Sequence, residues 1–175
     1  MSDAALESLR FPVGKFKADP NANMSAMIDQ IAATPANIAR IVSGLTPAQL
    51  ETAYRPGGWT GAQVVHHMAD SHANAYIRTR FALVEENFTV KPYDENIWAE
   101  LVDAKSTDVA PSVSMLQGLH ARWVALLRTL TPEQFQRPLL HPERGPMTIH
   151  NLVQLYAWHG RHHAGHLQSI KDSAK

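Results

Sequence analysis

The sequence of 175 residues contains no cysteine. This absence excludes disulfide bridges, thiolate-ligated zinc, iron–sulfur clusters and a cysteine nucleophile. An excess of charge of one sign is also missing, since 16 Lys and Arg balance 16 Asp and Glu. The whole-chain charge therefore gives no support for a nucleic-acid partner or for general binding to an anionic membrane.

Long apolar runs are missing as well. Gly, Pro, His or Asn interrupts each uncharged stretch, and none approaches the ~20 apolar residues that a membrane-spanning helix needs. The segment Met1–Glu7 lacks the basic and apolar regions of a secretory signal. We therefore expect a cytoplasmic protein without a membrane partner.

Helical patterns dominate, and strand patterns are weak throughout. Apolar residues recur at spacings of three and four in four long segments, which predicts amphipathic helices over 24–45, 60–86, 111–130 and 148–171. Pro35 predicts a kink or a restart in the first helix, with Thr34 as its candidate cap. The sequence thus predicts an all-α four-helix bundle that forms one domain over residues 1–175.

The connection over residues 87–110 is longer than the 2–8 residues typical of helix bundles. It contains a short helical candidate over 96–101, and it could cross the end of the bundle and cover a site there.

An internal repeat supports this division into helices. Leu45–Leu50 and Leu130–Phe135 each place Pro after a capping Thr, which predicts a short helix, and a Pro/Gly-rich loop and a further capping Thr follow each.

Histidine is abundant, with 10 residues, and two of them are suited to metal binding. His159 and His163 are four apart, so their rings project from one face of the last helix, as in zinc-protease helices. That face is apolar, and burying imidazoles without partners is costly, whereas a bound cation would compensate for the burial. His67 lies on the second long helix. Counted from the capping Thr of each helix, its angular position is close to that of His159 and His163 on the last helix.

The other histidines have less specific interpretations. His162 and His166 form a competing pair at the boundary of the apolar face, and His166 can lie one turn from His163 as a supporting or substrate-facing group. We expect His120 to be a hydrogen-bonded core residue and His66 to pair with Asp70 on the outer side. Surface or loop positions are expected for the three remaining histidines, namely His72, His141 and His150. The four tryptophans, Trp59, Trp98, Trp123 and Trp158, fit core or interface positions better than a cofactor cage.

Several motifs together resemble one family. They are Arg55–Thr60 followed by Val65–His72, Lys91–Glu95, and Tyr156–His163. Over residues 11–170 the sequence resembles the YfiT-like branch of the DinB superfamily. The resemblance implies a four-helix bundle with a long crossover between its second and third helices. It also implies one divalent metal per chain, zinc or nickel, and a homodimer.

The resemblance also assigns the metal ligands, because the histidine positions of the family motifs fall on His67, His159 and His163. At His166 many relatives have Gln, so whether His166 adds a ligand is left open. Three neutral ligands leave a position open on the metal, as in catalytic zinc sites, where the pKa of bound water is lowered toward ~7. A small thiol in that position would be held as a thiolate.

Three functions follow from this chemistry. The first is a metal-dependent hydrolase acting on a small molecule in a pocket at one end of the bundle. The second is S-transfer from a low-molecular-weight thiol, and the third is a metal-binding or stress-response module without turnover. His166 and Asp70 are acid–base candidates, and Tyr93, Arg78 and Arg122 are candidate substrate contacts. For Asp70, Arg78 and Arg122, a solvated or ion-paired helix face is the simpler explanation.

Overall fold

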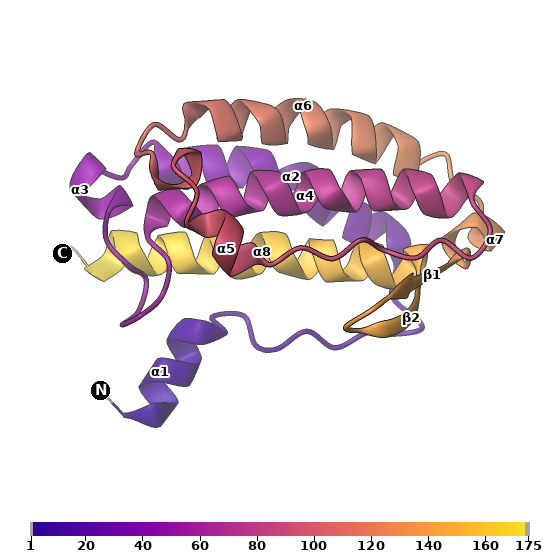
Figure 1. The fold of residues 1–175 in the computed structure, drawn as a ribbon, viewed down its shortest axis with the longest axis horizontal. Coiled ribbons are helices and arrows are strands. Elements are labelled where there is room, and N and C mark those ends of the chain that lie inside the picture. The colour runs from indigo at the N-terminus through magenta and orange to yellow at the C-terminus, as the bar shows by residue number, and fades with distance from the viewer. Residues whose placement is uncertain (1, 174–175) are drawn as a thin grey trace.

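The structure is a computed structural model that describes residues 2–173 (Figure 1). Four long helices form its body: α2 (Met24–Val42), α4 (Gly61–Val84), α6 (Ala110–Leu127) and α8 (Ile149–Ser173). The shorter elements are α1 (Asp3–Arg10), α3 (Pro47–Leu50), α5 (Glu95–Ala99), the 3-10 turn η1 (Asp103–Lys105), α7 (Pro132–Phe135), β1 (Pro138–His141) and β2 (Gly145–Thr148). The predicted all-α four-helix bundle is confirmed.

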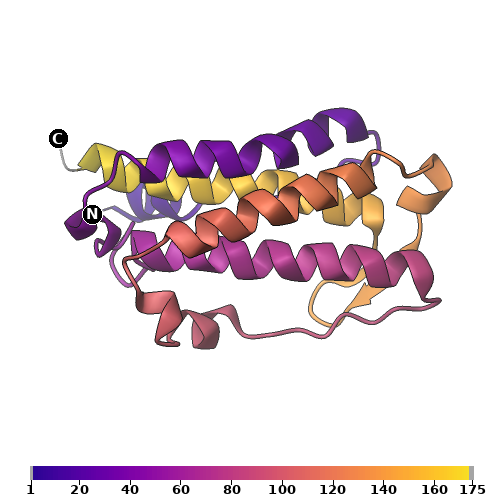
Figure 2. The ribbon, with the colours of Figure 1, turned by 90° about the horizontal axis from the view of Figure 1, so that it is seen from above.

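The four long helices lie side by side in the cyclic order α2, α6, α4, α8 (Figures 1 and 2). Helices α4 and α6 both begin at the end of the bundle where α3 lies, whereas α2 and α8 run in the opposite direction. Residues 85–109, which join α4 to α6, return along the length of the bundle, with α5 and η1 near their end (Figure 2). The long crossover is confirmed, but it runs along the side of the bundle and does not cross its end.

Threonine caps begin three helices, as the sequence predicts. Thr46, Thr60 and Thr131 each accept a hydrogen bond from the backbone N–H of a Gln three residues later, and that Gln returns a bond to the backbone N–H of the Thr. This reciprocal capping box satisfies two backbone donors that the helix itself leaves free. Thr148 and Asn151 exchange equivalent bonds at the start of α8. Helices α4 and α8 carry the candidate ligands. The residue at which each of them begins is therefore determined by side chains only three residues apart in the sequence.

The restart predicted at Pro35 does not occur, because α2 continues through this residue. Thr34 caps nothing; its hydroxyl donates to the carbonyl of Gln30, one turn earlier in the same helix. Pro35 has no N–H to donate to the carbonyl of Ile31, four residues before it, so that carbonyl is free for another donor. His120 of α6 donates to it from Nδ1, at 2.7 Å.

A β-hairpin precedes α8 where the sequence predicts a loop. Strand β1 pairs with β2 in antiparallel register from Pro138 opposite Thr148 to His141 opposite Gly145. The crossover joins this hairpin at its beginning, since Val90 donates to Leu140 and Leu140 donates to Phe88. The hairpin thereby holds the first part of the crossover beside α4 and α8.

The N-terminal segment lies along α8. Its backbone accepts a hydrogen bond from Trp158 at Gly14, and the backbone N–H of Asp19 donates to Gln154.

Two apolar clusters fill the bundle. One surrounds Trp123 and Leu152, and the other surrounds Met68 and Leu167. Within the described residues, 2–173, no helix combines the length and the apolar character needed to cross a membrane.

Candidate metal centre

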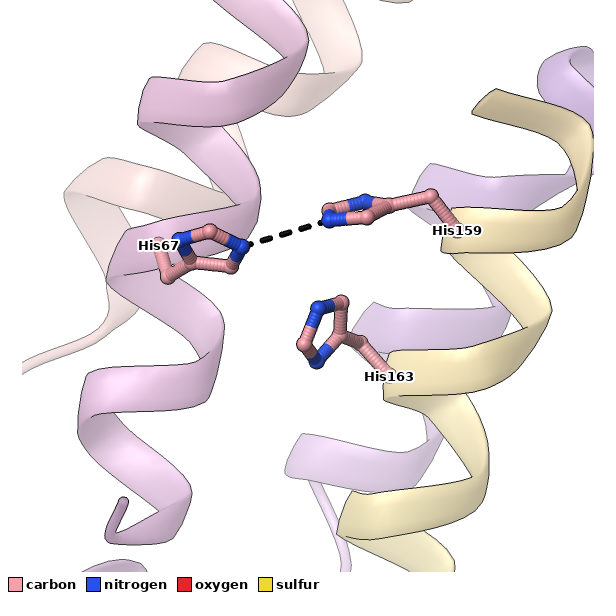
Figure 3. Close-up of side chains that lie close together, drawn as sticks. All are labelled: His67, His159 and His163. Atoms are coloured by element: carbon pink, nitrogen blue, oxygen red, sulfur yellow. Dashed lines mark hydrogen bonds between the residues drawn. The ribbon is translucent and has the colours of Figure 1, made fainter. Parts of the chain in front are cut away.

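Helices α4 and α8 bring three histidine side chains together. His67 projects from α4, and His159 and His163 project from α8, with their rings converging on a common point (Figure 3). The Nε2 atoms of His67 and His159 are 3.2 Å apart, and one ring nitrogen from each residue lies within 4.8 Å of the others. Nitrogens from two separate helices therefore meet at one place, as the spacing of the residues predicts.

These distances fit a divalent cation. Zinc–imidazole bonds of about 2.0–2.1 Å at tetrahedral angles separate two donor nitrogens by roughly 3.3 Å. The 3.2 Å between the Nε2 atoms of His67 and His159 matches this separation. A small rotation of the His163 side chain would bring its nitrogen to the same distance from the other two. The donor set, three imidazoles without a fourth protein ligand in the group, is typical of catalytic sites, because structural zinc sites are closed by four protein ligands.

The surroundings keep the three imidazoles neutral, as ligands must be. Burial lowers the pKa of His67 to about 4, with a further contribution from the charge of His166. Burial is the main reason that the pKa of His159 and of His163 lies well below the ordinary value, and the charges of the neighbouring imidazoles lower it further. At neutral pH each ring thus keeps a lone pair for a cation.

A cavity of about 380 Å³ opens beside the three histidines. Its wall comes from α4, α8, the crossover, the hairpin and the N-terminal segment, so it lies along the side of the bundle. The expected pocket at one end of the bundle is therefore wrong in its position. Trp59 and Trp158 line the cavity, and the Trp59 ring packs on that of His67 with a centroid separation of 4.6 Å. Trp59 and Trp158, expected in core or interface positions, therefore also form part of the cavity wall.

Two of the three expected substrate contacts lie in this cavity. Arg78 and Tyr93 both line it, and the guanidinium of Arg78 lies 5.9 Å from the centre of the Tyr93 ring. Burial raises the pKa of Tyr93 to about 12, so its hydroxyl remains a hydrogen-bond donor. Arg122 is elsewhere: it is exposed on α6, and its guanidinium lies over Tyr76.

The two acid–base candidates also lie outside the cavity. Asp70 faces the side of α4 where η1 lies, and its pKa is raised by burial and by the charge of Asp103. The expected pairing of His66 with Asp70 is limited to an interaction of charges, which by itself lowers the pKa of Asp70, because the ring nitrogens of His66 contact the Ser112 hydroxyl and the Ser106 carbonyl, each at 2.8 Å. His166 is buried beneath the site, with its ring stacked on Tyr54 at 3.9 Å.

His162, His163 and His166 form a second group with ligand atoms close enough for a cation. In this group both nitrogens of His166 already have partners, since Nδ1 lies 3.3 Å from His163 Nδ1 and Nε2 lies 3.3 Å from the Arg10 carbonyl. His163 belongs to both groups. In the first group the facing donor atoms, His67 Nε2 and His159 Nε2, contact each other across 3.2 Å, and a shared cation would replace this contact, so the first group fits a cation better.

Three histidines expected on the surface or in loops are buried, namely His72, His141 and His150. His72 is the most consequential of them, because its Nε2 contacts His159 Nδ1 at 3.1 Å and its Nδ1 contacts His120 Nε2 at 2.9 Å. His120 is a hydrogen-bonded core residue, as expected. Pro35 is the one sequence signal for this network, because it frees the carbonyl that His120 binds.

The bundle topology and the three-histidine group together define a helical metalloprotein scaffold. The family model described as "DinB superfamily" matches residues 30–167, and the chain belongs to this superfamily. It is 44% identical over 169 residues to "Putative metal-dependent hydrolase YfiT" of Bacillus subtilis, covering 93% of this chain and 94% of that protein. It is 43% identical over 173 residues to "Putative metal-dependent hydrolase GK0616" of Geobacillus kaustophilus, covering 96% and 97%.

The solved structure of Bacillus subtilis YfiT has the same fold. Its TM-score with this chain is 0.92 at 42% sequence identity, and the match covers 95% of this chain and 98% of that one. That protein is described as "a probable metal-dependent hydrolase with an unusual four-helix bundle topology".

Proposed function

We propose that the protein is a metal-dependent hydrolase in which His67, His159 and His163 bind one divalent cation, zinc or nickel. The convergence of three neutral imidazoles beside a cavity is the observation that carries this proposal. A cation held there would supply Lewis acidity, which lowers the pKa of water that reaches it. Relatives at 43–44% identity that carry the name "Putative metal-dependent hydrolase" support the same interpretation.

The protein's own residues would bind a small substrate in the cavity. Arg78 is only 8% exposed, and its guanidinium donates a hydrogen bond to the Lys91 carbonyl, 3.3 Å away. No carboxylate lies within ion-pair distance of Arg78 anywhere in residues 2–173. A buried cation without an acidic partner favours an anionic group of the substrate as its partner. Tyr93 would donate a second hydrogen bond from its protonated hydroxyl.

Transfer of a low-molecular-weight thiol is the alternative, and it depends less than hydrolysis on an acid–base residue. Hydrolysis needs a group that delivers a proton to the leaving group, and both expected acid–base residues lie outside the cavity. A thiol that has lost its proton to the solvent can attack an electrophile with less assistance. A metal-binding module without turnover is the third function, and a homodimer in the cytoplasm remains part of the proposal.

An activity screen with and without a thiol separates these functions. Zinc- or nickel-loaded protein is assayed on panels of esters and amides, and on electrophiles with an added thiol. Hydrolysis that is lost on chelation and needs water alone supports the proposal. A sulfur-containing product that forms only with the thiol present overturns hydrolysis in favour of transfer. Loaded protein that is inert on both panels supports the non-catalytic module.

A further inference from the structure

Each candidate ligand on α8 has its second nitrogen bound to another buried histidine. His159 Nδ1 lies 3.1 Å from His72 Nε2, and His72 Nδ1 lies 2.9 Å from His120 Nε2. The row ends at the Ile31 carbonyl, 2.7 Å from His120 Nδ1. Three imidazoles from three helices therefore connect the metal centre to one backbone oxygen of a fourth helix, α2.

The carbonyl fixes the direction of every hydrogen bond in this row. A carbonyl oxygen only accepts, so Nδ1 of His120 must carry the proton. A neutral imidazole has one N–H and one lone pair, so Nε2 of His120 accepts and Nδ1 of His72 donates. By the same step Nε2 of His72 accepts and Nδ1 of His159 donates. His159 is left with its lone pair on Nε2, the atom that faces His67.

Proline makes the end of the row possible. Without Pro35, the Ile31 carbonyl would accept from the backbone of residue 35 within α2. Burial then isolates the row from water, because the side chains of His72 and His120 are 0% and 2% exposed. Water therefore cannot offer these rings other partners, so the order of donors and acceptors is enforced by the protein alone.

A shorter row of the same kind serves His163. Its Nδ1 lies 3.3 Å from His166 Nδ1, and His166 Nε2 lies 3.3 Å from the Arg10 carbonyl. The carbonyl requires the proton of His166 on Nε2, so Nδ1 of His166 accepts from Nδ1 of His163. The lone pair of His163 is then on Nε2, and Figure 3 shows the ring with one nitrogen turned toward His67 and His159.

We infer that His72, His120 and His166 are positioning residues: two rows of hydrogen bonds, each ending on a backbone carbonyl, hold His159 and His163 as Nδ1–H tautomers that present Nε2 to the cation. The consequence for metal binding rests on the proposed metal centre, whereas the tautomers themselves do not. Supporting hydrogen bonds of this kind typically contribute about 10–100-fold to metal affinity.

Nitrogen NMR of the metal-free protein tests the inference directly. Long-range ¹H–¹⁵N spectra of the histidine-labelled full chain show which ring nitrogen carries the proton. We expect Nδ1–H in His72, His120, His159 and His163, and Nε2–H in His166. His72→Phe removes the acceptor of His159, so His159 should become a mixture of tautomers. His72→Gln keeps an amide oxygen as acceptor and should restore Nδ1–H.

Metal affinity supplies the second measurement. Titration with Zn²⁺ in competition with a chromophoric chelator should show an affinity about 10–100-fold lower for His72→Phe, and close to wild type for His72→Gln. His150→Phe is the matched control, because His150 is buried on α8 but bonds to Gln154. It should leave both the His159 tautomer and the affinity unchanged.

Two results would overturn the inference. One is an Nε2–H tautomer of His159 in the wild-type protein, which decides the question even if His72→Phe does not fold. The other is a His72→Phe variant with unchanged tautomer and unchanged affinity. Absence of zinc binding by a wild-type protein that shows the expected tautomers would instead contradict the proposed metal centre and leave the rows intact.

Discussion

At the scale of single residues, the two nitrogens of a histidine have separate tasks. In His159 and His163 one nitrogen faces the other candidate ligands and the second bonds to a buried histidine. The spacing of four residues in the sequence predicted that both rings share a face. It could not predict His72 as a partner, because that contact depends on how α4 packs against α8. The surface position expected for His72 was wrong for this reason.

His166 offers a prediction at this scale. His166→Leu removes the acceptor of the His163 Nδ1–H group, so zinc affinity should fall by about 10–100-fold while one site per chain remains. His166→Gln places an amide oxygen there and should retain affinity closer to wild type. Competition titration with a chelator measures both variants. Complete loss of the site in His166→Leu would show that His166 is itself a ligand.

At the scale of elements, helix starts were predictable and packing was not. The capping threonines Thr46, Thr60 and Thr131 fix where helices begin through contacts within four residues, which a sequence displays directly. The restart predicted at Pro35 is wrong, because tertiary packing keeps α2 continuous and His120 satisfies the carbonyl that proline frees. The hairpin β1–β2 was missed because its strands are only four residues long and contain proline.

Gly160 tests the packing of α2 on α8. A Cβ atom at this position would lie 2.5 Å from the Thr34 hydroxyl oxygen and 3.0 Å from its methyl group. Gly160→Ala should therefore lower the free energy of unfolding by about 1–3 kcal/mol, as overpacking of a helix interface does. Urea denaturation measures the loss. The double variant with Thr34→Ala removes both clashing atoms and should recover most of it; equal losses in the single and double variants would show that this contact is not responsible.

At the scale of the whole molecule, many imidazoles are buried in a neutral state. Burial lowers the pKa of His67, His162 and His166 to about 4, and holds those of His72, His159 and His163 well below the ordinary value of 6.5. Below pH 6.5 the unfolded chain therefore binds more protons than the folded one. Stability is greatest above this pH and decreases as the pH falls toward 4.

We therefore expect metal-free protein to unfold in acid, with a midpoint between pH 4 and 6.5. Urea denaturation at a series of pH values should show a free energy of unfolding that declines steadily across this range. Bound zinc should deepen the decline, because protonation of the ligands also releases the cation. A free energy of unfolding that stays constant down to pH 4 would contradict the burial of neutral histidines.

The central claim is that His67, His159 and His163 bind one cation, and calorimetric titration of metal-free protein with Zn²⁺ tests it most directly. The wild-type protein should bind one ion per chain, and His67→Leu, His159→Leu and His163→Leu should each abolish that binding. His141→Leu, which changes a histidine in the wall of the same cavity, should leave the stoichiometry and the affinity unchanged. If His67→Leu still binds one ion with unchanged affinity, and His162→Leu does not, the cation belongs to the second histidine group and the account is wrong.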